Sequence, residues 1–135
     1  MTTARRRRLV AAGLAVTTVL AGLAVRFALR RGAASDVAGD ALYAILIYLV
    51  VVLLAPRTRP AVAAVVAASL CVAIELFQLT GLPAAWAATF PPIALVLGTG
   101  FDARDIVVYL VAVAGAAFLD KTISARLSAP ARLPH

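Results

Sequence analysis

The chain has 135 residues, of which 64% are hydrophobic and 14% are charged, and its formal net charge is +7. A soluble domain has roughly 45–50% apolar and about 25% charged residues, so this composition excludes a soluble globular protein. The high positive charge is also found in nucleic-acid-binding domains. Here, however, the basic residues flank apolar runs, where they set membrane topology and meet anionic lipid. We therefore expect the lipid bilayer, and no nucleic acid, as a partner.

Four apolar runs follow one another along the chain. A membrane-spanning helix needs about 20 mostly apolar residues, and a backbone in lipid must satisfy its own hydrogen bonds. The sequence therefore predicts an all-α integral membrane protein, with residues 1–135 forming a single transmembrane domain of four helices. The predicted spans are approximately 9–29, 37–55, 61–80 and 102–120.

The first span follows a basic segment, residues 1–8, which contains Arg5–Arg8. A basic segment before an apolar run is also typical of a cleaved signal peptide. This run is long for a signal peptide, and Arg26, Arg30 and Arg31 follow it closely. We therefore expect an uncleaved helix.

Lysine and arginine divide unevenly between the two sides that four spans create. The side with both termini carries nine of them and one acid, Asp120, whereas the other side carries four and five acids. Basic residues in short loops stay in the cytoplasm. This predicts cytoplasmic tails at residues 1–8 and 121–135. Abundant Ala, Val and Arg are typical of a GC-rich bacterial source, so we expect a multi-pass protein of the bacterial inner (plasma) membrane with both termini cytoplasmic.

Glu75 and Gln78 stand at the outer end of the third span. With a helical rise of 1.5 Å per residue, Glu75 lies about 21 Å from Ala61, which is still inside a hydrocarbon core about 30 Å thick. A carboxylate at that depth is costly, so it must face the bundle interior and find a partner. Arg26 lies at a similar depth and is the expected ion-pair partner, in a pair that either locks one helix to another or belongs to a ligand or proton site. Arg30, Arg31 and Arg104 are the alternatives.

The second and fourth spans also begin with polar residues on the outer side. Asp40 lies one turn before Tyr43, and the segment LGTGFDARD (97–105) precedes the last span, with Tyr109 one turn after Asp105. Gly98 and Gly100 allow a tight backbone there, and Asp102 fits a helix start. Together these residues predict one polar layer. Its candidate ligand-binding members are Arg26, Asp40, Tyr43, Glu75, Gln78, Asp102, Arg104, Asp105 and Tyr109.

The segment between the third and fourth spans, residues 80–96, is broken by glycine and proline. It holds Trp86 and Phe90, and amphipathic aromatic residues favour the membrane interface. We expect an interfacial segment with a short helix, which serves either as a plain connector or as a lid over the polar layer.

These motifs, in this order, resemble the small bacterial membrane proteins of domain-of-unknown-function family 2809 (DUF2809), over roughly residues 26–120. A looser likeness links the layout to VanZ-like membrane proteins. The resemblance implies a four-span inner-membrane protein with no established activity. The positions it carries over are Asp40, Glu75, Gln78, Gly98, Phe101, Asp102, Asp105 and Tyr109. The chain departs from the family pattern at Pro92-Ile93-Ala94, where an arginine is common, and at Ala112, where a glycine is common.

The expected function is binding of a small polar or lipid-headgroup ligand in a polar pocket at the extracytoplasmic helix ends. Alternatives are a membrane enzyme acting on a lipid-linked cell-envelope substrate, with Glu75 or Asp105 as general acid or base, and a minimal transporter working as a homo-oligomer. No nucleophile–base pair is evident, so no catalytic residue is assigned. With one cysteine, Cys71, and one histidine, His135, we expect no metal site and no cofactor.

Overall fold

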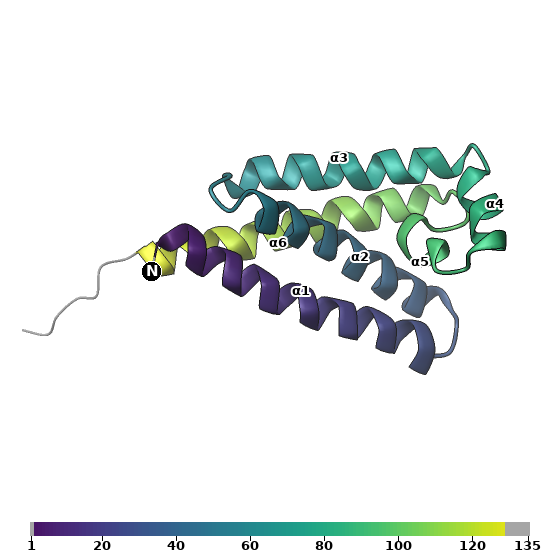
Figure 1. The fold of residues 1–135 in the computed structure, drawn as a ribbon, viewed down its shortest axis with the longest axis horizontal. Helices are drawn as coiled ribbons and strands as arrows, with labels where there is room; N and C mark the ends of the chain where they lie inside the picture. The colour runs from purple at the N-terminus through teal and green to yellow at the C-terminus, as the bar shows by residue number, and fades with distance from the viewer. Residues whose placement is uncertain (1, 129–135) are drawn as a thin grey trace, which may run out of the picture.

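The computed structural model describes residues 2–128, all of whose regular elements are α-helices (Figure 1). In chain order they are α1 (Thr3–Ala28), α2 (Ala33–Leu54), α3 (Pro60–Gln78), α4 (Leu82–Thr89), α5 (Ile93–Leu97) and α6 (Ala103–Ser128). Arg5–Arg8 form part of the first turns of α1, and Lys121 continues α6. The rest of the predicted C-terminal tail, residues 129–135 with Arg132 and His135, lies outside the described residues.

The prediction of four spans is confirmed: α1, α2, α3 and α6 are each long and apolar enough to cross a membrane. The chain is therefore a multi-pass membrane protein whose helices contact the lipid bilayer. α1 and α6 have 26 residues each. At 1.5 Å per residue each is about 39 Å long, more than the hydrocarbon thickness, so their ends extend beyond it.

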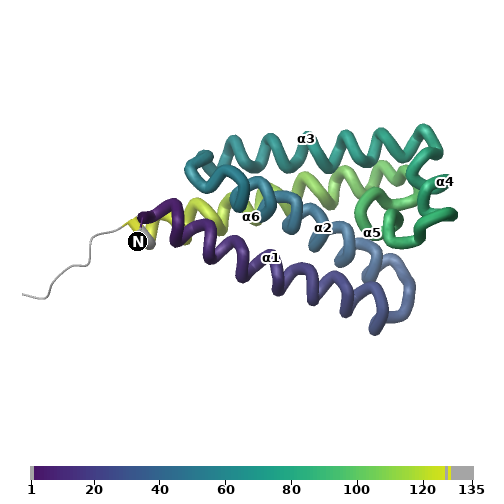
Figure 2. The backbone as a smooth tube through the Cα atoms, viewed as in Figure 1, coloured from purple at the N-terminus to yellow at the C-terminus, as the bar shows by residue number. Residues whose placement is uncertain are grey.

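The four long helices run side by side in alternating directions, so the bundle has two distinct ends (Figures 1 and 2). The basic end contains the start of α1, the α2–α3 turn (55–59) and the end of α6. The acidic end contains the α1–α2 turn (29–32), α4, α5 and the start of α6. α2 packs against α1, α3 and α6, whereas α1 touches α6 only slightly.

One stripe of α3 faces the bundle interior with a spacing of four residues. Ala63, Ala67 and Cys71 are fully buried along it, and the same row continues to Glu75. Residues at this spacing share one helix face, and small side chains let neighbouring helices approach closely. The pattern confirms that Glu75 points inward, and it shows that Cys71 is a buried packing residue with a free thiol.

The segment between α3 and α6 folds into two short helices, α4 and α5, rather than the one that was predicted. Pro91 and Pro92 separate them, because proline lacks the backbone N–H that would continue α4. The Phe77 ring, at the end of α3, lies 5.7 Å from the Trp86 ring of α4, measured between centroids. This contact helps to hold α4 against the acidic end of the bundle.

Candidate functional site

Glu75 is completely buried at the acidic end and is surrounded by hydrogen-bond donors of its own chain. The backbone N–H of Asp102 donates to Glu75 Oε1 at 2.7 Å. The Tyr109 hydroxyl donates to Oε2 at 3.2 Å, and Gln78 Nε2 donates to the same oxygen at 3.4 Å. Since Asp102 immediately precedes α6, the carboxylate also lies at the positive end of that helix dipole.

The predicted ion pair between Glu75 and an arginine is wrong. Within residues 2–128, the ion pairs join Arg7 to Asp120 and Arg104 to its neighbours Asp102 and Asp105. Arg26 is exposed on α1, which packs on the far side of α2 from α3 (Figure 1). Glu75 needs no cation, because N–H and O–H groups that hydrogen-bond a carboxylate stabilise its charge directly.

The polar side chains of α2 and α3 hold the backbone that leads from α5 into α6. Gln78 Nε2 donates to the Leu97 carbonyl at 2.8 Å, and the Tyr43 hydroxyl donates to the Val96 carbonyl at 2.6 Å. Glu75 accepts the third bond, from the Asp102 N–H. The side chains of Tyr43, Gln78 and Glu75 therefore hold residues 96–102, which we call the α5–α6 segment. Sequence reasoning placed Glu75, Gln78 and Tyr43 in one layer, but it did not foresee that their partners are backbone groups.

Gly98 lies at the tightest point of the α5–α6 segment. Its φ is +65° and its ψ is −171°, a region open essentially only to glycine. A Cβ atom built on Gly98 would lie 2.5 Å from Gln78 Nε2. Gly100, the second glycine predicted to shape this loop, has no atom within 4 Å of such a Cβ, so close packing requires glycine only at position 98.

We expect Gly98→Ala to destabilise the folded protein by about 2 kcal/mol through its backbone conformation, and also to displace the Gln78 amide. Gly81→Ala is the matched control, because Gly81 has φ +73° but open space around its Cβ position. It should cost about 1 kcal/mol, the penalty of a left-handed residue alone. Thermal unfolding in detergent measures both variants. Equal losses would contradict both the more strained backbone of Gly98 and its close packing against Gln78.

The acids that open α6 are engaged close to the surface. Asp102 Oδ1 accepts a hydrogen bond from the Arg104 backbone N–H at 2.8 Å, which confirms Asp102 as the cap of α6. Arg104 Nη2 lies 3.7 Å from Asp102 Oδ2 and 3.4 Å from Asp105 Oδ1. Arg104 is therefore shared by its two neighbouring acids. Asp105 in turn lies next to Asp40 of α2.

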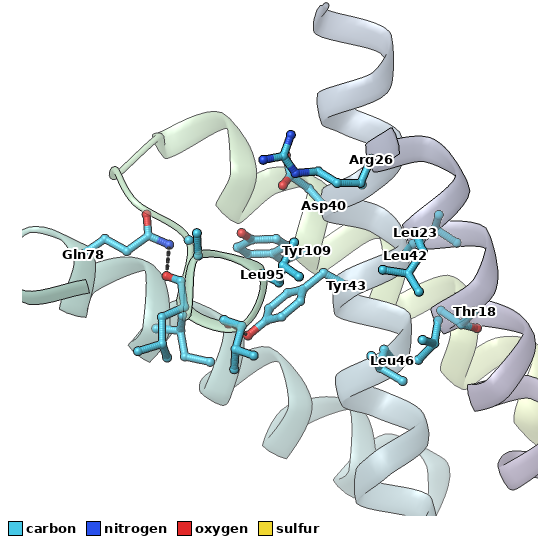
Figure 3. Close-up of a pocket in the computed structure, with 18 residues that line it drawn as sticks. Thr18, Leu23, Arg26, Asp40, Leu42, Tyr43, Leu46, Gln78, Leu95 and Tyr109 are labelled. Carbon is cyan, nitrogen blue, oxygen red and sulfur yellow. Dashed lines mark hydrogen bonds between the residues drawn. The ribbon is translucent and has the colours of Figure 1, made fainter. Parts of the chain in front are cut away.

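A pocket of about 410 Å³ lies between α1, α2 and the α5–α6 segment (Figure 3). Arg26 and Asp40 lie together at one end of it, and Thr18 and Leu46 lie at the other. Tyr43 and Tyr109 also line it, with ring centroids 6.2 Å apart. Gln78 completes the wall nearest α3. Across residues 2–128, no group of three or more His, Cys, Asp or Glu side chains is placed to hold a metal ion.

The structure thus brings Glu75, Gln78, Asp102 and Tyr109 into one hydrogen-bonded group. It places Arg26, Asp40 and Tyr43 in the adjoining pocket.

The family model described as a protein of unknown function (DUF2809) matches residues 29–113, more than half of the chain. The chain belongs to the DUF2809 family. Comparison with curated proteins found no match, and neither did comparison with solved structures.

This DUF2809 protein has a second polar group, which sequence reasoning missed. Only Tyr48 and the α2–α3 turn of this group lie within the matched residues 29–113. At the basic end, Arg7 Nε donates to Asp120 Oδ1 at 3.0 Å and Arg7 Nη2 to Oδ2 at 2.5 Å. The Tyr48 hydroxyl and Ser124 Oγ donate to the same carboxylate at 2.6 and 3.0 Å. Arg7 Nη1 also donates to the Pro56 and Thr58 carbonyls. The signal in the sequence was Asp120 itself, the single acid on a side with nine basic residues.

Proposed function

We propose that this DUF2809 protein binds a membrane amphiphile, a lipid or lipid-linked molecule, with its headgroup in the pocket at the acidic end. The observation that carries the proposal is the gradient of polarity along the pocket. Arg26 and Asp40 form one end, and the lining towards Thr18 is apolar, with Leu23, Leu42 and Leu46. Thr18 and Arg26 are eight residues apart on α1, so the gradient extends over about 12 Å.

This direction matches the way a lipid is oriented in a bilayer. The charged end of the pocket lies near the helix ends, where headgroups are found, and the apolar end lies towards the middle of the bundle. The distribution of lysine and arginine supports an extracytoplasmic acidic end. On this proposal the ligand comes from the outer leaflet of a bacterial plasma membrane.

Binding accounts for the site better than catalysis or transport does. A catalytic Glu75 would have to reach a substrate, yet both of its oxygens accept hydrogen bonds from buried or part-buried donors of the chain. A transport path would have to join the two polar ends of the bundle. A second pocket of about 490 Å³ extends from Thr18 to Arg7 and Asp120, but between these ends its lining is apolar, with Leu14, Ile45 and Leu49, so it offers no polar route.

Filling the pocket tests the proposal. Gly22 lines it from α1, and a Cβ added there meets no atom within 4 Å, so Gly22→Leu should enter the pocket without disturbing the backbone. If the leucine displaces about two methylene groups of the ligand, at about 0.8 kcal/mol each, affinity should fall about tenfold. Native mass spectrometry of the protein, titrated with an equimolar mixture of phosphatidylethanolamine and phosphatidylglycerol, measures total bound lipid.

Gly13→Leu is the matched control. Gly13 is on the same helix, its Cβ position is equally open, and it does not line the pocket. It should leave total lipid binding unchanged. Equal binding by wild type, Gly22→Leu and Gly13→Leu would show that lipid does not occupy this pocket and would overturn the proposed function.

A further inference from the structure

The charged end of the pocket restricts the chemistry of its ligand. Resting on the proposed function, we infer that the headgroup is zwitterionic and of the phosphoethanolamine class, with its phosphate at Arg26 and its primary ammonium group at Asp40. Arg26 and Asp40 come from adjacent helices and lie side by side at the same end of the pocket (Figure 3). In phosphoethanolamine the phosphate and the ammonium group are separated by two carbons, so the phosphate could bind Arg26 while the ammonium group binds Asp40.

Arg26 supplies the anion-binding half of the site. Although it lies close to Asp40, it forms no ion pair with any acid among residues 2–128, whereas Arg7 and Arg104 both do. Its guanidinium group therefore keeps its donors for a ligand. The planar, forked arrangement of those donors matches phosphate oxygens, and such charge-assisted bonds are roughly twice as strong as neutral ones.

Asp40 supplies the cation-binding half. Its carboxyl group lies next to that of Asp105, and the negative charges of Asp105 and Glu75 both act on it. Carboxylates held this close repel one another. Arg104, whose charge also acts on Asp40, is already shared between Asp102 and Asp105. An ammonium group has three donors and no acceptor, so it can bind Asp40 and offset the excess negative charge.

Gln78 adds an independent requirement for a hydrogen-bond donor. Its side-chain Nε2 is used by Leu97 and Glu75, but its Oε1 is buried and accepts no hydrogen bond within the described part of the chain. Gln78 is only 8% exposed and lines the same pocket. Leaving a buried acceptor unsatisfied destabilises the protein. A hydrogen-bond donor of the ligand that reaches the α3 wall of the pocket could satisfy it. At Asp40, a choline trimethylammonium group has no N–H to donate.

Lipids with identical acyl chains and different headgroups test the inference on the wild-type protein. In native mass spectrometry titrations, phosphatidylethanolamine should bind about fivefold or more tightly than phosphatidylglycerol, which lacks the amine, and than phosphatidylcholine, which lacks the N–H donors. Equal affinities for all three headgroups would overturn the ethanolamine assignment. If Gly22→Leu still lowered binding in that case, the proposed pocket would stand and only its headgroup class would be wrong.

Two charge variants locate the halves of the site. Asp40→Asn should remove the preference for phosphatidylethanolamine over phosphatidylglycerol, whereas Arg26→Gln should weaken both lipids about tenfold, as expected for loss of a charge-assisted bond. Asp36→Asn and Arg30→Gln are the controls, because both residues are exposed at the same end and neither lines the pocket. If the controls changed lipid preference as much as the pocket variants, the effect would come from surface charge and the assignment to Arg26 and Asp40 would fail.

Discussion

Replacing Arg7 with glutamine is expected to destabilise the folded bundle by about 3–5 kcal/mol, the range for removing one partner of a buried ion pair. The side chains of Arg7 and Asp120 are only 11% and 14% exposed. Without the guanidinium group, the Asp120 carboxylate keeps the Tyr48 and Ser124 hydroxyl donors but loses its counter-charge. The carbonyls of Pro56 and Thr58 lose their donor in the same variant, so α1, α6 and the α2–α3 turn are all loosened together.

A mutant cycle distinguishes this network from a general effect of charge. Unfolding by heat or by SDS titration in bicelles should show that Arg7→Gln with Asp120→Asn costs less than the sum of the single variants, because the double variant leaves no isolated buried charge. Arg8→Gln is the control, since Arg8 is the next residue along the chain and is exposed. It should change the free energy of unfolding by no more than about 0.5 kcal/mol. A similarly small loss for Arg7→Gln would contradict the network.

The four-helix architecture could be predicted because composition alone determines it. Long apolar runs must be helical in lipid, since no water is available for their backbone groups. The inward position of Glu75 also follows from local sequence, because Ala63, Ala67 and Cys71 precede it at intervals of four on the same helix face. Such features depend on residues that are near one another in the chain.

The partners of the buried charges could not be predicted in the same way. Asp102 is 27 residues from Glu75 and contributes a backbone N–H, a group that every residue except proline possesses. Arg7 is one of four consecutive arginines, and successive residues on a helix point in different directions around its axis. The charge distribution along the sequence does not distinguish which residue of Arg5–Arg8 contacts Asp120. Only the packing of α1 beside α2 and α6 selects Arg7 to face Asp120.

The second large effect is expected at Glu75. Glu75→Ala should cost about 3–5 kcal/mol, because the Asp102 N–H and the Tyr109 hydroxyl would each lose their acceptor, at about 1–3 kcal/mol apiece, and a cavity would remain. The α5–α6 segment should loosen first, since that bond joins it to α3. Hydrogen exchange followed by mass spectrometry should therefore show faster exchange at Asp102 than in wild type. Exchange in the middle of α3 should change much less.

Mutant cycles identify which partner stabilises the Glu75 carboxylate. Tyr109→Phe should cost about 1.5–3 kcal/mol in the wild-type background, as for a hydrogen bond to a charged group. It should cost close to nothing once Glu75 is alanine, because the hydroxyl then has no acceptor to lose. Arg26→Gln combined with Glu75→Ala should instead be additive within about 0.3–0.5 kcal/mol, as for independent sites. Coupling of Glu75 to Arg26 above that range, with none to Tyr109, would show that an ion pair rather than the start of α6 stabilises the buried carboxylate.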